Sequence, residues 1–595
     1  MDVKEIIKKI NDKQNMIVEL IIMSCVTGCF VTNLVFRTYK KVENIDYLAE
    51  TNINTIIIAM ILAAVVAGVI YVMDKKMASI VMFVAVFVYS VLSMYENKEN
   101  IYYAIGLIII SVLALVYVKK DLLYVCNKIK INDKIGLVIV CALGLALIIF
   151  IGDVTVLRYK TYSNSTFDFG IFAQMFENMK NTGHPTTTVE RPELGSFSHF
   201  GVHFSPIYYV MLPFYFVFSS PEAVQIMQAV VLGLAVIPLY YLCRHYKLTT
   251  KFSILICALY CLIPATAAGT FYDFHENCCI PVLLLSLILA IEKKKDIWAV
   301  VFALLLVMVK EDAAFNLLVL GAYFLLSKRD KKRGAIMSVA ALVYFVFAMN
   351  MVHSYGIGDL ANTRFGNMMY DKEGSLFQIA FSILANPAYA VLQLLDEENF
   401  QYFLLMILPV GTALIQKKKY SRYILLGTFV IFNLLPGYAY LHDIGFQYNF
   451  GTIVFLIYIA VMTVSEWKAD RRNTWIATSV VLTFILFVSF TFPKIVTYRE
   501  RYKDNKYYYE QMDAAIELVP RNASVLVSGF IMPHLYDVTN LTVIGENVEV
   551  TQDYVVVDMR AGYSTDLDIV GMQLQEGYTL VTEVKDTLRV YEKNK

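Results

Sequence analysis

Residues 135–152 read IGLVIVCALGLALIIFIG, an uninterrupted apolar run without a charged side chain. An α-helix rises about 1.5 Å per residue, so a helix of this length approaches the roughly 30 Å thickness of a bilayer's hydrocarbon core. The run lacks the apolar–polar alternation of membrane β-strands. It therefore predicts a membrane-spanning helix.

Similar apolar runs recur along most of the chain. Hydrophobic residues form 58% of the 595 residues and charged residues 17%, against roughly 45–50% and about 25% in soluble proteins. We therefore expect an all-α polytopic membrane bundle. The formal charge of +1 comes with no basic stripe, which excludes a nucleic-acid partner. The fifteen runs are 17–36, 53–73, 78–94, 101–118, 135–152, 222–243, 252–268, 279–291, 297–309, 313–327, 335–352, 402–415, 423–439, 450–466 and 474–492.

The basic loops set the expected orientation, because Lys and Arg are enriched in cytoplasmic loops. All the basic loops share one side if the proline-containing stretches 205–218 and 376–395 enter the membrane without crossing it. We expect fifteen spans, a cytoplasmic N-terminus with a retained first helix, and an extracytoplasmic C-terminus. The basic loops are 4–13, 74–76, 119–134, 244–251, 292–296, 328–333, 417–422 and 468–472.

Polar chemistry concentrates on the predicted external face. Seven of the eight histidines lie in or beside external segments, and only His245 is expected to be cytoplasmic. The external segments are a long loop 153–204, the segments 269–277, 310–312, 353–375 and 438–449, and the tail 494–595.

The tail differs from the rest of the chain. It holds 11 basic and 16 acidic residues, a net charge of −5 that favours solubility. A helical stretch at 507–518 and β-rich runs at 524–528, 541–544, 554–558, 579–584 and 588–591 predict a small α/β domain. No phosphate-binding loop or nucleophile-elbow motif occurs in it, which favours binding or scaffolding over catalysis. The expected parts are a four-helix membrane extension (1–134), a transmembrane module (135–493) and a soluble extracytoplasmic α/β domain (494–595).

Two motifs lie in the long external loop. Residues 166–174 read TFDFGIFAQ, and Asp168 is either a helix N-cap or a partly desolvated carboxylate that acts as a base or metal ligand. Residues 196–206 read SFSHFGVHFSP, in which His199 and His203 are four residues apart. On a helix they share a face, and they either bind a metal or a phosphate or only form hydrogen bonds at the membrane interface.

Three further motifs flank later spans. Residues 272–276 read YDFHE and residues 310–312 read KED. Charges at such depth are costly unless they are paired or line a wet cavity, so both are candidates for a functional site. A tight surface turn is the alternative for the second. His442 and Asp443, followed by QYN at 447–449, lie at the mouth of the run 450–466.

In this order the motifs resemble the membrane proteins catalogued as domain of unknown function 2079, over roughly residues 135–595. Those proteins resemble the GT-C superfamily of glycosyltransferases, which use polyprenyl-phosphate sugars. The resemblance implies that an acidic residue of the first external loop, here Asp168, acts as a base or positions the acceptor and any metal. A second acidic site would fall on Glu276 or Asp273.

The expected function is transfer of a sugar from a polyprenyl-phosphate donor to a cell-envelope glycan, lipid or protein on the external face. Asp168 and Glu276 are the expected catalytic residues. No cofactor is certain, and since the loop has no paired acidic residues the use of a divalent metal stays open. The expected substrate-binding residues are Gln174, His199, His203, Asp273, His275, Lys310, Glu311, Asp312, Gln447 and Tyr448, with the donor phosphate near His199, His203 and Lys310.

Two other functions compete with this one. A transporter or lipid flippase would need polar residues near mid-membrane on several spans, but those present are few and uncharged, which argues against ion coupling. A non-catalytic cell-envelope assembly protein would use its tail to bind partners. The polar residues in question are Asn33, Gln225, Gln228, Asn350 and Asn433.

Overall fold

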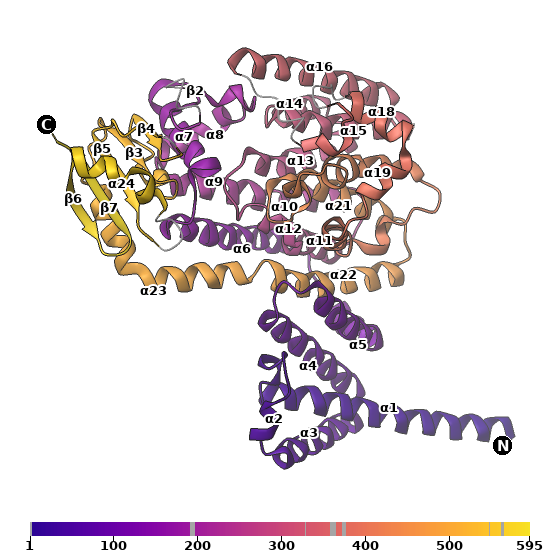
Figure 1. Ribbon diagram of the computed structural model, residues 1–595. Coiled ribbons are helices and arrows are strands. Elements are labelled where there is room, and N and C mark those ends of the chain that lie inside the picture. Colours follow the sequence, from indigo (N-terminus) through magenta and orange to yellow (C-terminus); the bar gives the residue numbers. More distant parts are fainter. Residues whose placement is uncertain are drawn as a thin grey trace.

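The computed structural model describes residues 3–190, 197–327, 329–356, 364–371, 377–546, 548–560 and 565–594. Parts of the expected loops lie outside these ranges. They are 191–196, which includes the first residue of the motif 196–206, then Lys328, 357–363 and 372–376. The described chain is a helical bundle with a small sheet domain at its C-terminal end (Figure 1).

Nine helices of the described part are long and apolar enough to cross a membrane, judged by length and composition. Four form an N-terminal unit: α1 (Val3–Val35), α3 (Ile53–Met73), α4 (Lys75–Glu96) and α5 (Ile101–Lys128). The others are α6 (Asp133–Lys160), α9 with α10 (Pro221–Leu234 and Val236–His245), α16 (Lys331–Tyr355), the segment containing α21 (Phe450–Ser465), and α22 with α23 (Ala469–Phe490 and Pro493–Ile516).

Shorter helices fill the space between these long ones. They are α2 (Tyr47–Glu50), α7 (Ile171–Thr182), α8 (Tyr208–Val217), α11 (Thr250–Leu262), α12 (Pro264–Ala268), α13 (Ile280–Glu292), α14 (Asp296–Val307), α15 (Ala314–Leu326), α18 (Phe377–Ala385), α19 (Pro387–Gln393) and α20 (Glu397–Ile407).

Six of the fifteen expected spans are shorter or more irregular than a full crossing requires. The run 402–415 stops being helical at Ile407, just before Pro409, and the run 423–439 is wound in 3₁₀ and π turns before Pro436. Proline lacks a backbone N–H and clashes with the preceding turn, which explains why neither run continues as an α-helix. By length and composition, nine helices of the described residues are candidate crossings, and the expected total of fifteen stays a prediction.

The helix directions sort the loops into two ends. The end predicted to be external, called the external end below, contains the C-terminus of α6 and the N-termini of α13, α15 and α21, and His203 contacts Glu311 there. At the opposite, internal end, Asp133 at the start of α6 accepts hydrogen bonds from Arg244 and Thr250. The expected separation of the charged motifs from the basic loops is therefore present, whereas the side of the membrane that each end faces stays a prediction.

The core surrounds α21, whereas the N-terminal unit lies at the margin. Inside α21 and its N-terminal turn, 89% of the apolar window is buried, against 11% for α3. The N-terminal unit is attached through α4 and α5, whose Phe83 and Leu115 share a buried cluster with Leu482 and Ile485 of α22 (Figure 1). Most of α3 is thus left to face lipid.

The tail is a five-stranded mixed sheet in the order β4-β3-β5-β7-β6. The strands β4, β3 and β5 run parallel to one another, and β7 runs antiparallel to both of its neighbours, β5 and β6. All five strands lie where the β-rich runs predicted them. The helix α24 was not predicted, and the helix expected at 507–518 is the end of α23, which begins at Pro493. The strands are β3 (Ser524–Val527), β4 (Asn540–Val543), β5 (Tyr554–Asp558), β6 (Tyr578–Val584) and β7 (Leu588–Lys593), with α24 at Thr565–Gly577.

The tail packs directly on the long external loop. The His534 ring lies between the rings of Tyr159 and Tyr162, with centroid distances of 4.2 and 3.7 Å. The Thr166 hydroxyl donates to the Gly529 carbonyl at 2.9 Å. The tail and the membrane module therefore share a buried interface beside the Asp168 turn.

Candidate functional site

Asp168 occupies a strained turn between α6 and α7. Its backbone has φ 73° and ψ −86° inside the turn Thr166–Gly170, a conformation that costs a non-glycine residue on the order of 1–3 kcal/mol. Gly170, not Asp168, is the N-cap of α7, so the N-cap alternative is wrong. The Asp168 side chain stays 38% exposed and its Oδ1 lies 3.5 Å from Nε2 of His275. Strain at a half-exposed carboxylate is typical of a functional position.

The electrostatics keep Asp168 ionised. Burial alone would raise its pKa, but His275 nearby, with Lys310 and His203 farther off, outweighs burial and lowers the pKa below the ordinary value. An ionised carboxylate beside an imidazole can accept a proton or a hydroxyl hydrogen bond.

Asp273 is a second carboxylate of a different kind. It is 1% exposed, one oxygen accepts a hydrogen bond from the Asn164 amide, and Oδ2 has no hydrogen-bond partner among the described residues. Burial raises the pKa of Asp273 to about 7, although Arg158 opposes the shift. Two neighbouring carboxyl groups with separated pKa values are a common feature of catalytic sites.

Lys310 and Glu276 form a buried ion pair. Their side chains are 1% and 0% exposed, and Nζ of Lys310 lies 3.2 Å from Oε1 of Glu276. The Tyr208 hydroxyl donates to the other oxygen of Glu276 at 2.9 Å. Burial opposes ionisation of Glu276, but Lys310 and His275 outweigh it and lower the pKa to about 2. The KED motif is therefore not the tight surface turn that was its alternative.

The two histidines of the second motif have separate carboxylate partners. Nδ1 of His199 lies 3.0 Å from Glu190, and Nδ1 of His203 lies 2.8 Å from Glu311. The ring centroids are 6.1 Å apart, on a single 3₁₀ turn (His199–Gly201) and the residues after it. Both side chains are largely buried, with 5% of His199 and 13% of His203 exposed. A shared metal between them does not follow from this arrangement.

A cavity of about 650 Å³ opens beside this cluster. One end is polar and contains His203, Asp312, Arg364 and Tyr448; Arg364 lies 5.4 Å from the Tyr448 ring centroid. Burial raises the pKa of Asp312 to about 6 despite Lys310. The rest of the wall is apolar, and includes Phe315, Phe345, Met349, Ile379, Ile383 and Phe432. A cavity of this composition suits an amphiphile with an anionic head.

The structure brings most of the predicted site residues together at the external end. Those around the Asp168 turn, the buried ion pair or the polar end of the cavity are Asp168, His203, Asp273, His275, Glu276, Lys310, Glu311, Asp312 and Tyr448. Lys310 and His199 do not line the cavity, so the expectation that the donor phosphate lies near them and His203 stays a prediction. Gln447 is buried beside Tyr448 and does not line the cavity either.

The predicted substrate-binding residue Gln174 is buried and hydrogen-bonded to the loop and the tail. Its amide oxygen accepts from the Thr187 hydroxyl at 2.7 Å and the Thr188 amide at 2.9 Å. Its Nε2 donates to Thr188 at 3.0 Å and to the Val538 carbonyl at 3.4 Å. Both ends of the amide are thus used to join the loop to the tail.

The sequence reasoning missed Arg364, Glu190, Asn164 and Tyr208. Arg364 had a usable signal, since it is the one arginine of the predicted external segment 353–375. The other three are recognisable only from the fold, because their partners lie 9 to 109 residues away.

Metal ligation finds little support in these side chains. In the described ranges no group of three or more His, Cys, Asp or Glu side chains is arranged to hold a metal ion. Asp168 and His275 contribute two donors, and Asp273 is turned to Asn164. The use of a divalent metal therefore stays a prediction.

Fold and site together define a polytopic membrane protein with a charged pocket at one end of its bundle. The model of the family described as "Predicted membrane protein (DUF2079)" matches residues 158–577, so this chain belongs to that family. No curated protein matches it. Among solved structures, the chain is similar to ArnT from Cupriavidus metallidurans bound to undecaprenyl phosphate, with 11% identity, a TM-score of 0.48, and coverage of 76% of this chain and 97% of that one.

Proposed function

We propose that this protein is a membrane glycosyltransferase that transfers a sugar from a polyprenyl-phosphate donor to a hydroxyl group of an acceptor at the external end. The observation that carries the proposal is an ionised, half-exposed Asp168 at the same end of the bundle as a mostly apolar cavity whose polar end holds Arg364 and His203; Asp168 itself is not part of the lining. A lipid-linked donor needs such a cavity, and a hydroxyl acceptor needs such a carboxylate.

The donor lies with its polyprenyl chain along the apolar wall of the cavity. Its phosphate faces Arg364, the cation that lines the polar end and is linked to the Tyr448 ring and hydroxyl. A guanidinium suits this task because its planar donors match phosphate oxygens. Lys310 acts from behind the wall, because its charge is already paired with Glu276.

The acceptor hydroxyl binds at Asp168, on the water-accessible side of the turn. As its oxygen attacks the anomeric carbon, the bond between that carbon and the phosphate oxygen breaks and its electron pair stays on the phosphate. The hydroxyl proton passes to the Asp168 carboxylate. His275 is a positioning residue, since it holds Asp168 through a contact of 3.5 Å. Attack opposite the leaving phosphate inverts the anomeric configuration.

The tail supports the catalytic turn in this scheme. Met532 packs so closely on Gly170 that a Cβ there would lie 2.5 Å from the Met532 sulfur. Thr166 is bonded to Gly529 on the other side of Asp168. The tail thereby restricts the turn from above and leaves an acidic, water-facing surface near which a glycan, lipid or protein acceptor enters.

The test is a transfer assay with the purified full-length protein and labelled polyprenyl-phosphate sugars. Asp168→Asn keeps the shape and removes the charge, and loss of a general base costs about 10²–10⁴-fold in rate. Asp153→Asn is the matched control, because Asp153 lies on α6 and pairs with Arg499 at 2.6 Å, away from the cavity. Wild-type turnover in Asp168→Asn would overturn the mechanism. Movement of labelled lipid between leaflets without sugar transfer would favour a flippase.

A further inference from the structure

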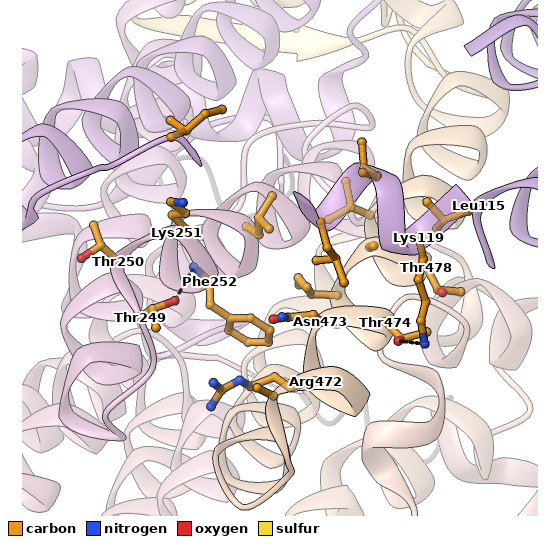
Figure 2. A pocket seen from close by; sticks show the side chains of 18 of the residues that line it. Leu115, Lys119, Thr249, Thr250, Lys251, Phe252, Arg472, Asn473, Thr474 and Thr478 are labelled. Carbon is orange, nitrogen blue, oxygen red and sulfur yellow. Dashed lines mark hydrogen bonds between the residues drawn. The ribbon is translucent and has the colours of Figure 1, made fainter. Parts of the chain in front are cut away.

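A second, larger cavity lies at the internal end of the bundle. It measures about 940 Å³ and is lined mainly by α5, α11, α22 and the segment 129–132 (Figure 2). Its distance from the candidate site follows from α6: Asp133 contacts Arg244 and Thr250 beside this cavity, and Arg158 contacts the Phe271 carbonyl at the external end. The two positions on α6 are about 38 Å apart at 1.5 Å per residue. The internal cavity is therefore separate from the proposed active site.

The lining of this cavity is strongly basic. Five cationic residues line it, and no carboxylate does so among the described residues. The counter-ions of Lys119 and Arg244 lie outside the lining and are mostly exposed: the side chain of Asp470, near Lys119, is 77% exposed, and that of Asp133, near Arg244, is 63% exposed. The five cations are Lys119, Lys130, Arg244, Lys251 and Arg472.

Two further features direct this charge toward an anion. The buried Nε of Arg472 has no hydrogen-bond partner among the described residues. In Figure 2, Arg472 and Asn473 of α22 lie near Thr249 and Phe252 at the start of α11. The helices α11 and α22 both begin here, at Thr250 and Ala469, and helix N-termini attract anions.

The other part of the cavity is apolar and open. Val116, Ile129 and Leu255 line it and remain 49%, 56% and 37% exposed. The cavity lies against α5 and α22, both of which are long enough to cross a membrane. A soluble anion would leave this apolar wall unfilled, whereas a lipid covers it.

We propose that the internal cavity binds an anionic membrane phospholipid. Its phosphate lies among the five cations and the two helix N-termini, and its acyl chains lie along the apolar wall. Basic pockets between membrane helices on the cytoplasmic side bind anionic headgroups in this way. The lipid thereby joins α5 of the N-terminal unit to α11 and α22 of the body.

The experiment is native mass spectrometry of the full-length protein in detergent, titrated with phosphatidylglycerol and, separately, with phosphatidylcholine. Wild-type protein should bind phosphatidylglycerol saturably and prefer it to phosphatidylcholine. The double variant Lys119→Gln/Arg472→Gln should weaken phosphatidylglycerol binding about 25-fold, since one Lys or Arg near an anionic lipid contributes a factor of about five.

The matched control is Lys120→Gln/Arg471→Gln, which removes the same charge from the neighbouring positions that do not line the cavity. It should bind like wild type; an equal loss in both pairs, or none in the first, would overturn the proposal. Ala477→Phe keeps all the cations and fills the apolar wall, so it should also weaken lipid binding. Competition by inorganic phosphate that fully replaces the lipid signal would identify a site for the free ion and contradict a lipid site. None of these readouts depends on sugar transfer.

Discussion

The two ends of the bundle handle charge in opposite ways. At the external end, Lys310 and Glu276 are 1% and 0% exposed and face each other directly. At the internal cavity, the side chain of Lys119 is 25% exposed and its partner Asp470 is 77% exposed, outside the lining. An ion pair buried in a low-dielectric interior holds both side chains in a fixed position. Cations whose partners are exposed to solvent keep a positive electrostatic potential that attracts an incoming anion. The contrast is what we expect if the external end is the proposed reaction site and the internal cavity is the proposed binding site.

The largest expected effect, all or none, is on the sidedness of these two ends. With the wild-type chain as the blank, cysteines introduced at Asn181 and Asn505 should react with an impermeant maleimide added outside cells, and cysteines at Lys331 and Lys418 should react only after lysis. The contrast follows because the first pair lies at the external end and the second in basic loops. Labelling at Lys331 in intact cells would invert the comparison.

Breaking the external ion pair should have the next largest effect. Lys310→Met leaves Glu276 charged and buried, and breaking a buried pair costs about 3–5 kcal/mol. We expect a large loss of folded protein in a detergent thermal-stability measurement. Lys310→Met/Glu276→Gln removes both charges and should recover much of the loss. If the single variant is as stable as wild type, the pair is not buried as described.

Arg364→Gln should act on the donor rather than on folding. A hydrogen bond to a charged group contributes about 1.5–3 kcal/mol, which corresponds to an increase of roughly 10- to 100-fold in the KM for the lipid-linked sugar. The turnover number should change less, because Arg364 is proposed to hold the phosphate in both ground and transition states. Arg499→Gln, at an exposed arginine outside the cavity, is the control. Equal KM values would remove Arg364 from the donor site.

The docking of the tail should weaken as the pH falls. Burial lowers the pKa of His534 to about 3, with Arg560 adding to the shift, and Asp513 is 3.9 Å away. Between pH 6.5, the ordinary value, and about 3, the released tail binds a proton that the docked tail does not. Docking should therefore lose up to about 1.4 kcal/mol per pH unit across this window. Hydrogen exchange of residues 524–527 measures this loss of docking free energy as a function of pH. If the pH dependence is unchanged in His534→Gln, or altered equally in the exposed His184→Gln, His534 is not its origin.

The smallest effect should come from the internal end without lipid. Arg244 pairs with Asp133 at 3.0 Å, but the side chains are 31% and 63% exposed. Such pairs contribute about 0–1 kcal/mol, so Arg244→Gln should shift the midpoint of thermal unfolding only slightly in lipid-free detergent. A loss as large as that of Lys310→Met would show that the internal cations are structural, as the external ones are.

Local patterns predicted the parts of this molecule that local forces determine. The five strands of the tail coincide with the predicted β-rich runs, which are bounded by turn residues. The helix α6 coincides with the uncharged apolar run 135–152. Four polar residues were recognisable because charged groups near a membrane are costly unless they are paired or functional; they are Asp168, His275, Glu276 and Lys310. Their grouping was expected only in outline, since the sequence shows which end they share but not which groups touch.

The remainder depends on contacts between distant segments. His203 meets Glu311 across 108 residues, and Asn164 meets Asp273 across 109. The hydrophobic periodicity of the sequence does not predict which distant residues will be in contact. Hydropathy also marks the apolar residues around Pro409 and Pro436 as spans, whereas the described chain is not a continuous α-helix there.

The junction of α22 and α23 sets the angle at which the tail is oriented about the helix axis. The segment from Ala469 to Ile516 runs 48 residues, with only a short turn at 491–492 (Figure 1). Each residue added to a helix turns whatever follows it by about 100° and advances it by about 1.5 Å. One inserted alanine at this junction would swing His534 away from its two tyrosines, and about seven residues, close to two full turns, would restore the angle at a height about 10 Å greater. The orientation of the tail over the Asp168 turn is thus encoded in a residue count at the junction of α22 and α23.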